Sequence, residues 1–390
     1  MASNPAIHGY CHPQFSAVRR LFMENFIDSG EVGASVSLCM HGEPVVNLWA
    51  GHTSWTRLQR WKEDTLVNIF SGTKGVTAIC ALMLVDRGLL DLDVPVAQYW
   101  PAFAQKGKAH IPVKWVLNHK AAVTGVRRRL LGRSLYNWKT MSNALAAQQP
   151  WWEPGSKHGY HALSYGWIMG EIIKSITGKT VGQFVADEIA QPLDIDLHIG
   201  MDKKEHSRIA PIILPVGIPE VADTWRLIGA CVTNPLGVSS SAILNPITIA
   251  TGVNSKQWRS GEIPAANAHC TALALAKLYG ALAFGGDAQE KPLVSADTLR
   301  FATEESSFGH DYVLKMDTRF SMGFMLNQKA EAGRFGPGKR SFGHNGAGGS
   351  FAFADPDVGL SYGYVMNRMG SYLLMDPRSQ RLIDAAYCCL

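Results

Sequence analysis

A serine and a lysine three residues apart, Ser71 and Lys74, are the residues whose types and spacing could do chemistry in this chain. A β-like run at 65–70 precedes them, and apolar residues at helical spacing follow. Residues three apart on a helix share one face, so the amine would lie beside the hydroxyl. A lysine whose pKa is lowered by burial can take the serine proton and create a nucleophile. The pair therefore predicts covalent catalysis, with an ordinary helix start as the alternative because Ser-x-x-Lys has only two fixed positions.

Two further segments could complete such a site. Tyr160 follows a Pro-Gly turn and precedes an amphipathic pattern, and a phenol held near a lysine can relay a proton. Residues 342–350 contain four glycines at the entry to a predicted strand, where backbone N–H groups could bind a developing oxyanion. The alternatives are a packed tyrosine, a tight glycine hairpin, and a structural role for His344.

Composition excludes several classes of function. The chain has 390 residues, 46% hydrophobic and 18% charged, with a net charge of +5, which indicates a globular protein with a large core and no nucleic-acid partner. The basic cluster at Arg127, Arg128, Arg129 and Arg133 is predicted to be a solvated face. Seven cysteines without metal-ligand spacing indicate a reducing compartment and no bound metal. With no export signal and no membrane-length apolar run, we expect a cytoplasmic protein without a membrane partner.

The elements that must position these residues follow from periodicity. Helices are predicted at residues 13–29, 71–88, 163–177, 181–189, 268–280 and 380–389. Strands are predicted at residues 33–40, 44–50, 321–326, 350–354 and 360–367. Residues 203–265, rich in Pro, Gly, Ser and Asn, are predicted to be a long irregular segment, which is typical of a lid or binding loop.

The order of these elements predicts two lobes. We expect residues 1–90 and 285–390 to form one discontinuous α/β lobe, because strands gather near both ends of the chain. Residues 91–284 are expected to form a mainly helical lobe with long loops, inserted into the first.

Three motifs together resemble those of the serine β-lactamase-like superfamily, which holds class C β-lactamases, penicillin-binding peptidases and family VIII carboxylesterases. The motifs are Ser71-Gly72-Thr73-Lys74, Tyr160-His161-Ala162 and His344-Asn345-Gly346, in the order and spacing of that superfamily. Flanking segments agree at 84–93, 95–96, 116–119, 165–173, 263–267 and 343–369, so the resemblance covers roughly residues 15–388. It is closest to the family VIII carboxylesterases and class C β-lactamase-like esterases.

The resemblance implies an α+β fold of the β-lactamase/transpeptidase type. An antiparallel sheet would be flanked by helices, and the active site would lie between the sheet lobe and the helical lobe. Ser71 would be the acylated nucleophile, and Lys74 with Tyr160 would form the general base. Tyr160 would then protonate the leaving group. The backbone N–H groups of Ser71 and Ala347 would form the oxyanion hole, and no cofactor is implied.

The resemblance also implies which residues contact the substrate. His344, Asn345 and Gly346 would do so, and His344 stands where β-lactamases and peptidases carry the lysine of Lys-Thr-Gly. Trp151, Trp152, Trp225 and Trp258 could surround an acyl or aryl group, and of these we expect Trp152 at the substrate, with packing as the alternative for each.

The chain departs from the superfamily pattern at three places. Ala162 replaces the asparagine of Tyr-x-Asn, His344 replaces a permanent cation, and residues 119–123 depart from the usual His-x-Ala-Gly loop. A histidine is a weaker partner for a carboxylate than a lysine at neutral pH. These departures favour a neutral ester over an anionic β-lactam.

The leading hypothesis is a serine carboxylesterase that cleaves a small-molecule ester through a Ser71 acyl-enzyme. An acyltransferase on the same fold would use the same residues, and a weak β-lactamase or D-Ala-D-Ala peptidase is a further alternative. A non-catalytic binding protein is disfavoured because the chain keeps Ser71, Lys74 and Tyr160. The sequence gives no prediction of the natural substrate or the oligomeric state.

Overall fold

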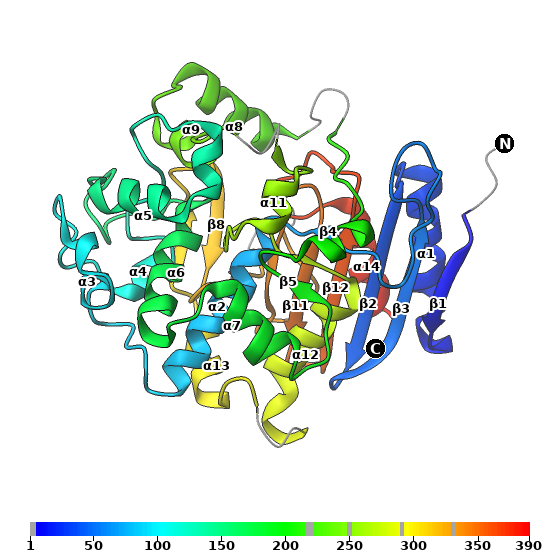
Figure 1. Ribbon diagram of the computed structural model, residues 1–390. Helices are drawn as coiled ribbons and strands as arrows, with labels where there is room; N and C mark the ends of the chain where they lie inside the picture. The colour runs from blue at the N-terminus through cyan, green and yellow to red at the C-terminus, as the bar shows by residue number, and fades with distance from the viewer. Residues whose placement is uncertain (1–4, 216–220, 248–251, 289–291, 329–332) are drawn as a thin grey trace.

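An antiparallel sheet of nine strands lies at the centre of the molecule (Figure 1). The computed structural model describes residues 5–215, 221–247, 252–288, 292–328 and 333–390. The strand order is β1-β3-β2-β12-β11-β10-β9-β8-β7, so strands from the two ends of the chain meet where β2 pairs with β12. The strands are β1 (Ile7–Cys11), β2 (Gly33–Met40), β3 (Glu43–Gly51), β7 (Ser307–His310), β8 (Asp317–Phe320), β9 (Met325–Leu326), β10 (Phe342–Asn345), β11 (Phe351–Asp355) and β12 (Leu360–Met366).

Helices cover both faces of this sheet because its strands carry apolar residues on both sides. On one face, α1 (Ser16–Asp28) and α14 (Pro377–Tyr387) pack on Tyr362 and Tyr364 of β12. On the other face lies α12 (Ala272–Ala288), where Ser361 Oγ donates to the carbonyl of Ala276. At Gly363 a Cβ atom would lie 2.2 Å from the carbonyl oxygen of Ala272, so glycine permits the close approach of helix and strand.

A second, helical region packs beside α12 around the buried helix α2 (Gly72–Asp86). Its partner α6 (Ser164–Thr177) is apolar along most of its length and ends at Gly178, whose φ of +71° forms the C-cap. The other helices are α3 (Val96–Tyr99), α4 (Val113–Leu117), α5 (Trp138–Ala147), α7 (Val181–Val185), α8 (Ala222–Thr233), α9 (Val238–Ile243), α11 (Lys256–Ser260) and α13 (Ala296–Thr303). The 3₁₀ segments are Pro13–Phe15, Pro101–Ala104, Gly132–Tyr136 and Lys203–Arg208, and a π-helix covers Ala186–Ala190.

A small three-stranded sheet lies beside α2. It consists of β4 (Val67–Asn68), β6 (His269–Cys270) and β5 (Leu197–His198), with β6 in the centre. Because β6 occupies 269–270, the helix predicted from residue 268 begins instead at Ala272.

The α+β fold with an antiparallel sheet and flanking helices is confirmed, and several details differ from the prediction. Strands β1, β7 and β8 were not predicted from their short, mixed sequences. The strand predicted at 321–326 is limited to β9. The residues before it form a turn, in which Gly323 has a φ of +95° and the Ser321 N–H donates a hydrogen bond to the Phe324 carbonyl. The segment 203–265 is not uniformly irregular, since it contains a 3₁₀ helix, α8, α9 and α11.

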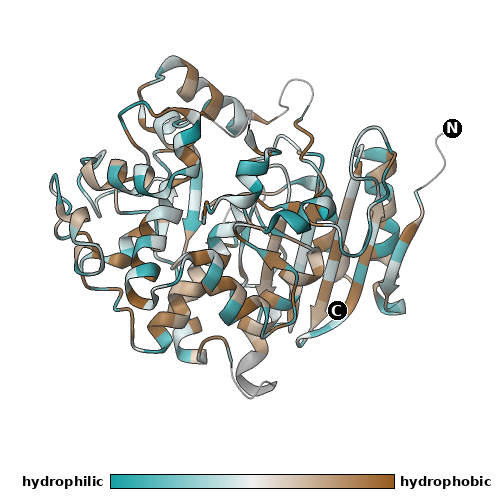
Figure 2. Cartoon of the chain, viewed as in Figure 1, coloured by the Kyte–Doolittle hydropathy of each residue, from teal (hydrophilic) through white to brown (hydrophobic). Residues whose placement is uncertain are grey.

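The division into a sheet lobe and a helical lobe stays a prediction. Most of α12 falls within residues 91–284, the range expected for the helical lobe, yet α12 packs against β2, β11 and β12 of the sheet. Figure 2 shows apolar residues concentrated on the central strands and on the helices beside them. Among the residues described, none of the helices has both the length and the hydropathy of a membrane-spanning segment.

Candidate active site

Ser71 lies at the N-cap of α2, directly after a sharp turn from β4. The turn places Phe70 in the left-handed region with a φ of +44°, an unfavourable backbone conformation that is typical of functional sites. Thr73 fixes the turn, because its Oγ1 donates to the Phe70 carbonyl at 2.6 Å and accepts from Ala268 N–H at 2.9 Å. The geometry presents the Ser71 hydroxyl at the end of a helix and inside a pocket.

Lys74 is completely buried behind Ser71. Its Nζ donates to Ser71 Oγ at 3.2 Å and to the carbonyl oxygens of Ala162 and Ala265 at 2.7 and 2.8 Å. Within the described part of the chain, no carboxylate forms an ion pair with this amine, and burial holds the pKa of Lys74 well below its ordinary value. A neutral amine at this position can accept the Ser71 proton.

The Tyr160 ring lies against the same amine, with its centroid 4.6 Å from Lys74 Nζ. It stacks on Phe320 at 5.9 Å between centroids and contacts the His119 ring at 4.8 Å. Burial raises the pKa of Tyr160, and a hydrogen bond with the Ser71 side chain lowers it. The structure therefore brings together the three residues predicted as nucleophile and general base.

Asp311, which the sequence analysis did not identify, anchors Tyr160. Its Oδ1 accepts from the backbone N–H groups of Tyr160 at 3.1 Å and of Val313 and Leu314 at 2.8 Å. The side chain is fully buried, and burial raises the pKa of Asp311 to about 6 although these N–H groups lower it. In the sequence, the only indication of a role for Asp311 is its position at the start of a turn. Aspartate is common at that position, so the sequence does not distinguish Asp311 from other turn residues.

The histidines around Lys74 are buried and neutral. Burial is the largest cause that lowers the pKa of His344 to about 3, with the nearby Lys74 amine as a smaller one, and burial likewise lowers the pKa of His161 to about 3. His344 Nδ1 lies 2.8 Å from the carbonyl oxygen of Asn345, its ring is 1% exposed, and it does not line the pocket. The site thus has no cation where the superfamily pattern carries a lysine.

The other two residues of the third motif shape the pocket through the backbone. Asn345 lines the pocket, but its Nδ2 donates to the carbonyls of Leu373 and Leu374 at 2.6 and 2.8 Å and so holds the opposite wall in place. At Gly346 a Cβ atom would lie 2.1 Å from the Ile69 carbonyl oxygen, so only glycine lets this segment approach the Ser71 turn.

The two residues predicted to form the oxyanion hole lie at the same pocket. Ser71 and Ala347 both line it, and in the described ranges neither of their N–H groups donates to a protein acceptor. Ala162, which stands in place of the asparagine of Tyr-x-Asn, contacts Lys74 through its backbone carbonyl only.

The four tryptophans lie apart from Ser71. Trp152 packs on Tyr312 with 5.9 Å between ring centroids and donates from Nε1 to the Lys157 carbonyl; it does not line the pocket, and its substrate contact stays a prediction. Trp151 stacks with Arg127, Trp258 is buried against Asn68, and Trp225 lies exposed on α8.

The pocket above Ser71 is small and mostly apolar, with a volume of about 150 Å³. Its aliphatic walls are Leu227, Ile243, Leu314, Met325, Leu373 and Leu374. Leu227 and Ile243 lie in the segment 203–265, which the sequence predicts as a lid or binding loop, but none of the six was identified individually. An isolated leucine in a loop or short helix looks the same whether it faces a core or a ligand.

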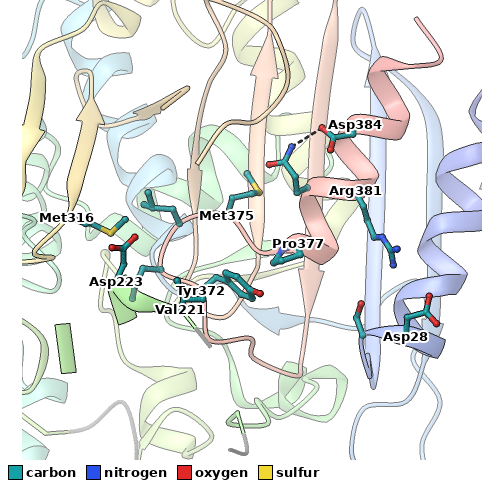
Figure 3. A pocket seen from close by; sticks show the side chains of 13 residues that line it. Asp28, Val221, Asp223, Met316, Tyr372, Met375, Pro377, Arg381 and Asp384 are labelled. Atoms are coloured by element: carbon teal, nitrogen blue, oxygen red, sulfur yellow. Dashed lines mark hydrogen bonds between the residues drawn. The ribbon is translucent and has the colours of Figure 1, made fainter. Parts of the chain in front are cut away.

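A second cavity of about 540 Å³ is lined in part by the same residues, Leu373 and Leu374 (Figure 3). Figure 3 shows Met316, Tyr372 and Met375 in its walls, with Asp223 and Asp384 at its margins. The two cavities share the leucine pair that Asn345 holds, so they are neighbours. In the described ranges, no group of three or more His, Cys, Asp or Glu side chains could hold a metal ion.

Comparisons with known proteins agree with this geometry. The Beta-lactamase family pattern matches residues 18–386. The esterase/beta-lactamase LipL of Mycobacterium tuberculosis is 34% identical over 384 residues, covering 95% of this chain and 85% of that protein. A crystal structure of a family VIII carboxylesterase has a TM-score of 0.89 at 40% identity, covering 99% of this chain and all of the other. A penicillin-binding protein homologue from Caulobacter crescentus has a TM-score of 0.88 at 40% identity and the same coverage. The chain therefore belongs to the Beta-lactamase family and is an enzyme of the serine β-lactamase-like hydrolase superfamily.

Proposed function

We propose that this protein is a serine carboxylesterase that cleaves small, neutral, apolar esters through an acyl-enzyme on Ser71. The observation that carries the proposal is the buried amine of Lys74, held 3.2 Å from Ser71 Oγ with no carboxylate partner in the described structure. The relatedness to an esterase and to a family VIII carboxylesterase structure supports the same reaction class.

In the first half of the reaction, Ser71 Oγ attacks the ester carbonyl carbon. Its hydroxyl proton passes to the Tyr160 phenol, which at the same time gives its own proton to the neutral amine of Lys74, and that amine later returns a proton to Tyr160. The carbonyl oxygen becomes negatively charged, and the N–H groups of Ser71 and Ala347 stabilise it. Tyr160 then passes a proton to the departing alcohol oxygen, which breaks the ester C–O bond. Water repeats the sequence on the acyl-enzyme and releases the carboxylic acid.

The substrate class follows from the pocket. A volume of about 150 Å³ with aliphatic walls holds a short acyl chain and offers no partner to a charged group. The low pKa of His344 leaves the site without the cation that would bind a substrate carboxylate. A neutral ester with a short apolar chain therefore fits better than an anionic substrate.

The decisive experiment follows p-nitrophenyl butyrate hydrolysis and intact protein mass together. We expect turnover with a transient mass increase of one butyryl group on the wild type, and neither on Ser71→Ala. Ser156→Ala is the matched control, because Ser156 is exposed and outside the pocket, and it should behave as the wild type. Full activity in Ser71→Ala would refute the proposal.

A second candidate activity is slow β-lactam hydrolysis, and the name of the relative LipL, an esterase/beta-lactamase, favours testing it. The same nucleophile and base would open the lactam ring. Because neutral His344 provides no charge for the β-lactam carboxylate, we expect nitrocefin turnover far below ester turnover. Comparable kcat/KM values for the two substrates would make β-lactam hydrolysis the better assignment.

A further inference from the structure

Basic and acidic residues are segregated along this chain. Of its 37 Lys and Arg and 32 Asp and Glu, twelve basic residues and no acidic residue fall within 94–152 and 224–261. The remainder of the chain is consequently net acidic, although the whole chain carries +5. Some of these basic residues are buried or paired, since Lys108 is buried and Arg226 pairs with Asp223, but Arg127, Arg128, Arg129 and Arg133 are exposed in one loop. A cluster of exposed basic residues attracts an anionic partner.

The two acid-free stretches meet at one place. Asn245, just after α9, donates from Nδ2 to the carbonyls of Val126 and Arg128, and its Oδ1 accepts from Leu130 N–H at 3.0 Å. Arg129 donates to the carbonyl of Pro235, just after α8. The basic loop that contains Arg127, Arg128, Arg129 and Arg133 therefore packs beside the helices α8 and α9, at the top of the view in Figure 1.

Large apolar side chains are exposed at this same place. Val232 is 72% exposed, Leu236 67%, Leu131 64% and Ile247 60%, and among the described residues only Leu58 is a more exposed large apolar side chain. Trp225 and Ile228 extend the set along the outer side of α8, where Figure 2 shows apolar positions on the uppermost helix. We call these six residues, with Arg127, Arg128, Arg129 and Arg133, the α8 surface.

The chemistry of this surface matches an anionic lipid surface. Apolar side chains on the outer face of a helix enter the head-group region of a bilayer, while neighbouring arginines attract anionic head groups. A second copy of this chain is a poorer partner, because two positive surfaces repel each other. Nucleic acid is a poorer partner as well, since its phosphates would leave the leucine, isoleucine and valine side chains in water.

The α8 surface lies back to back with the ester pocket. Leu227 of α8 lines that pocket and Cys231 is buried behind it, while Ile228 and Val232 face outward. A helix is about 10 Å across, so a lipid surface in contact with α8 would lie about that far from the Leu227 wall.

We propose that the α8 surface docks this protein on an anionic lipid surface, from which apolar esters enter the pocket. The docking stands on its own, and the supply of esters rests on the proposed esterase function. The sequence has no membrane-length apolar run and so predicts no membrane partner, but peripheral docking through exposed side chains of a folded protein needs no such run.

The test is co-sedimentation of the full chain with phosphatidylcholine vesicles that contain, or lack, about 30 mol% phosphatidylglycerol. We expect at least about tenfold more binding to the anionic vesicles, falling as salt rises from about 0.05 to 0.5 M. The double variant Val232→Glu and Leu236→Glu should lose this binding and keep hydrolysis of dissolved p-nitrophenyl butyrate. Arg128→Glu with Arg133→Glu should also lose it. Leu58→Glu is the matched control, because Leu58 is 90% exposed outside the α8 surface, and it should bind as the wild type.

Three outcomes would overturn the proposal. These are equal binding to both vesicle types, undiminished binding of the Glu double variant, or a dimer by light scattering that the same variant dissociates, which would make a second copy the partner. Binding by Ser71→Ala separates docking from catalysis. A wild type that binds anionic vesicles but hydrolyses no ester would refute the esterase function and leave the docking intact.

Discussion

The proposed catalytic centre at Ser71 and the walls of its pocket are built in different ways. Around Ser71, main-chain atoms position the polar groups: the carbonyls of Ala162 and Ala265 hold Lys74, and the amide of Tyr160 is held by Asp311. The pocket walls are instead aliphatic side chains from short helices and loops, such as Leu227 and Leu314. Main-chain positions depend on the whole fold, whereas a wall side chain can be exchanged singly. We infer that single substitutions change the range of substrates more readily than they change the type of reaction.

The variant with the largest expected effect is Lys74→Met, which keeps an unbranched buried side chain and removes the proposed base. We expect kcat to fall by about a thousandfold with little change in KM, because general-base catalysis typically contributes that much. Burial lowers the pKa of Lys74, so its neutral, active form persists to lower pH than an exposed lysine would allow, and wild-type activity should fall only as pH drops through that lowered pKa. The residual activity of Lys74→Met should not show this decrease at low pH, because the variant lacks the titrating amine. A variant with wild-type kcat would show that Tyr160 or another group is the base.

Asp311→Asn tests the main-chain support of Tyr160. Asparagine keeps an oxygen that can accept the three N–H groups but removes the charge that raises the pKa of Tyr160, so we expect kcat to fall about tenfold in a folded protein. Asp311→Ala leaves three buried N–H groups without an acceptor and should cost about a hundredfold or prevent folding. The exposed Asp317→Asn, in the same hairpin, is the matched control and should retain activity.

The same variant makes a prediction for stability. The pKa of Asp311 is raised from 3.8 to about 6 on folding, so the folded state binds this proton more tightly than the unfolded chain. The contribution of Asp311 to the unfolding free energy is therefore greatest below pH 3.8 and decreases as pH rises through about 6. Urea titrations between these pH values should show that decrease for the wild type relative to Asp311→Asn. The charged or titratable groups near Asp311 are Tyr160, His158 and His310, and their pKa values should be followed by NMR as a control. Identical pH dependence in the two proteins would contradict the prediction.

Leu227→Trp tests whether a single side chain in the pocket wall controls which substrates are accepted. Indole in place of an isobutyl group fills much of the small pocket, so kcat/KM for a hexanoate ester should fall at least about tenfold relative to an acetate ester. Ile228→Trp is the control, because Ile228 is the next residue on α8 and is exposed. Equal losses for both esters would mean that the acyl chain does not occupy this pocket.

The smallest expected effect concerns Ala122, in the loop that departs from His-x-Ala-Gly. Ala122 has a φ of +60°, a left-handed conformation that glycine adopts at little cost. Glycine at position 122 should relieve about 1–2 kcal/mol of backbone strain in the folded state. Glycine also increases the conformational entropy of the unfolded chain, which offsets part of this gain. We therefore expect Ala122→Gly to be more stable than the wild type by about 0.5 kcal/mol. Ala121→Gly, next to it and equally buried, lacks the positive φ and should destabilise the protein. Thermal unfolding of the two variants decides this prediction.

The sequence by itself determined the parts of this protein that depend on local geometry. Ser71 and Lys74 meet because helical spacing brings residues three apart together, and Gly178 ends α6 because it accepts a positive φ. The strand pair β2–β3 and the helices α1, α2 and α14 likewise follow from periodicity.

Only the tertiary structure decided which distant groups meet at Ser71. Asp311 contacts Tyr160 across 151 residues of chain, and Asn345 donates its amide hydrogens to the carbonyls of Leu373 and Leu374. His344 is neutral because its ring is buried beside Lys74. The identity of one residue in the sequence does not show whether its side chain will be buried. The reason is physical: hydrogen bonds, desolvation and aliphatic contacts act through space over a few ångströms, and only folding determines which residues come within that distance.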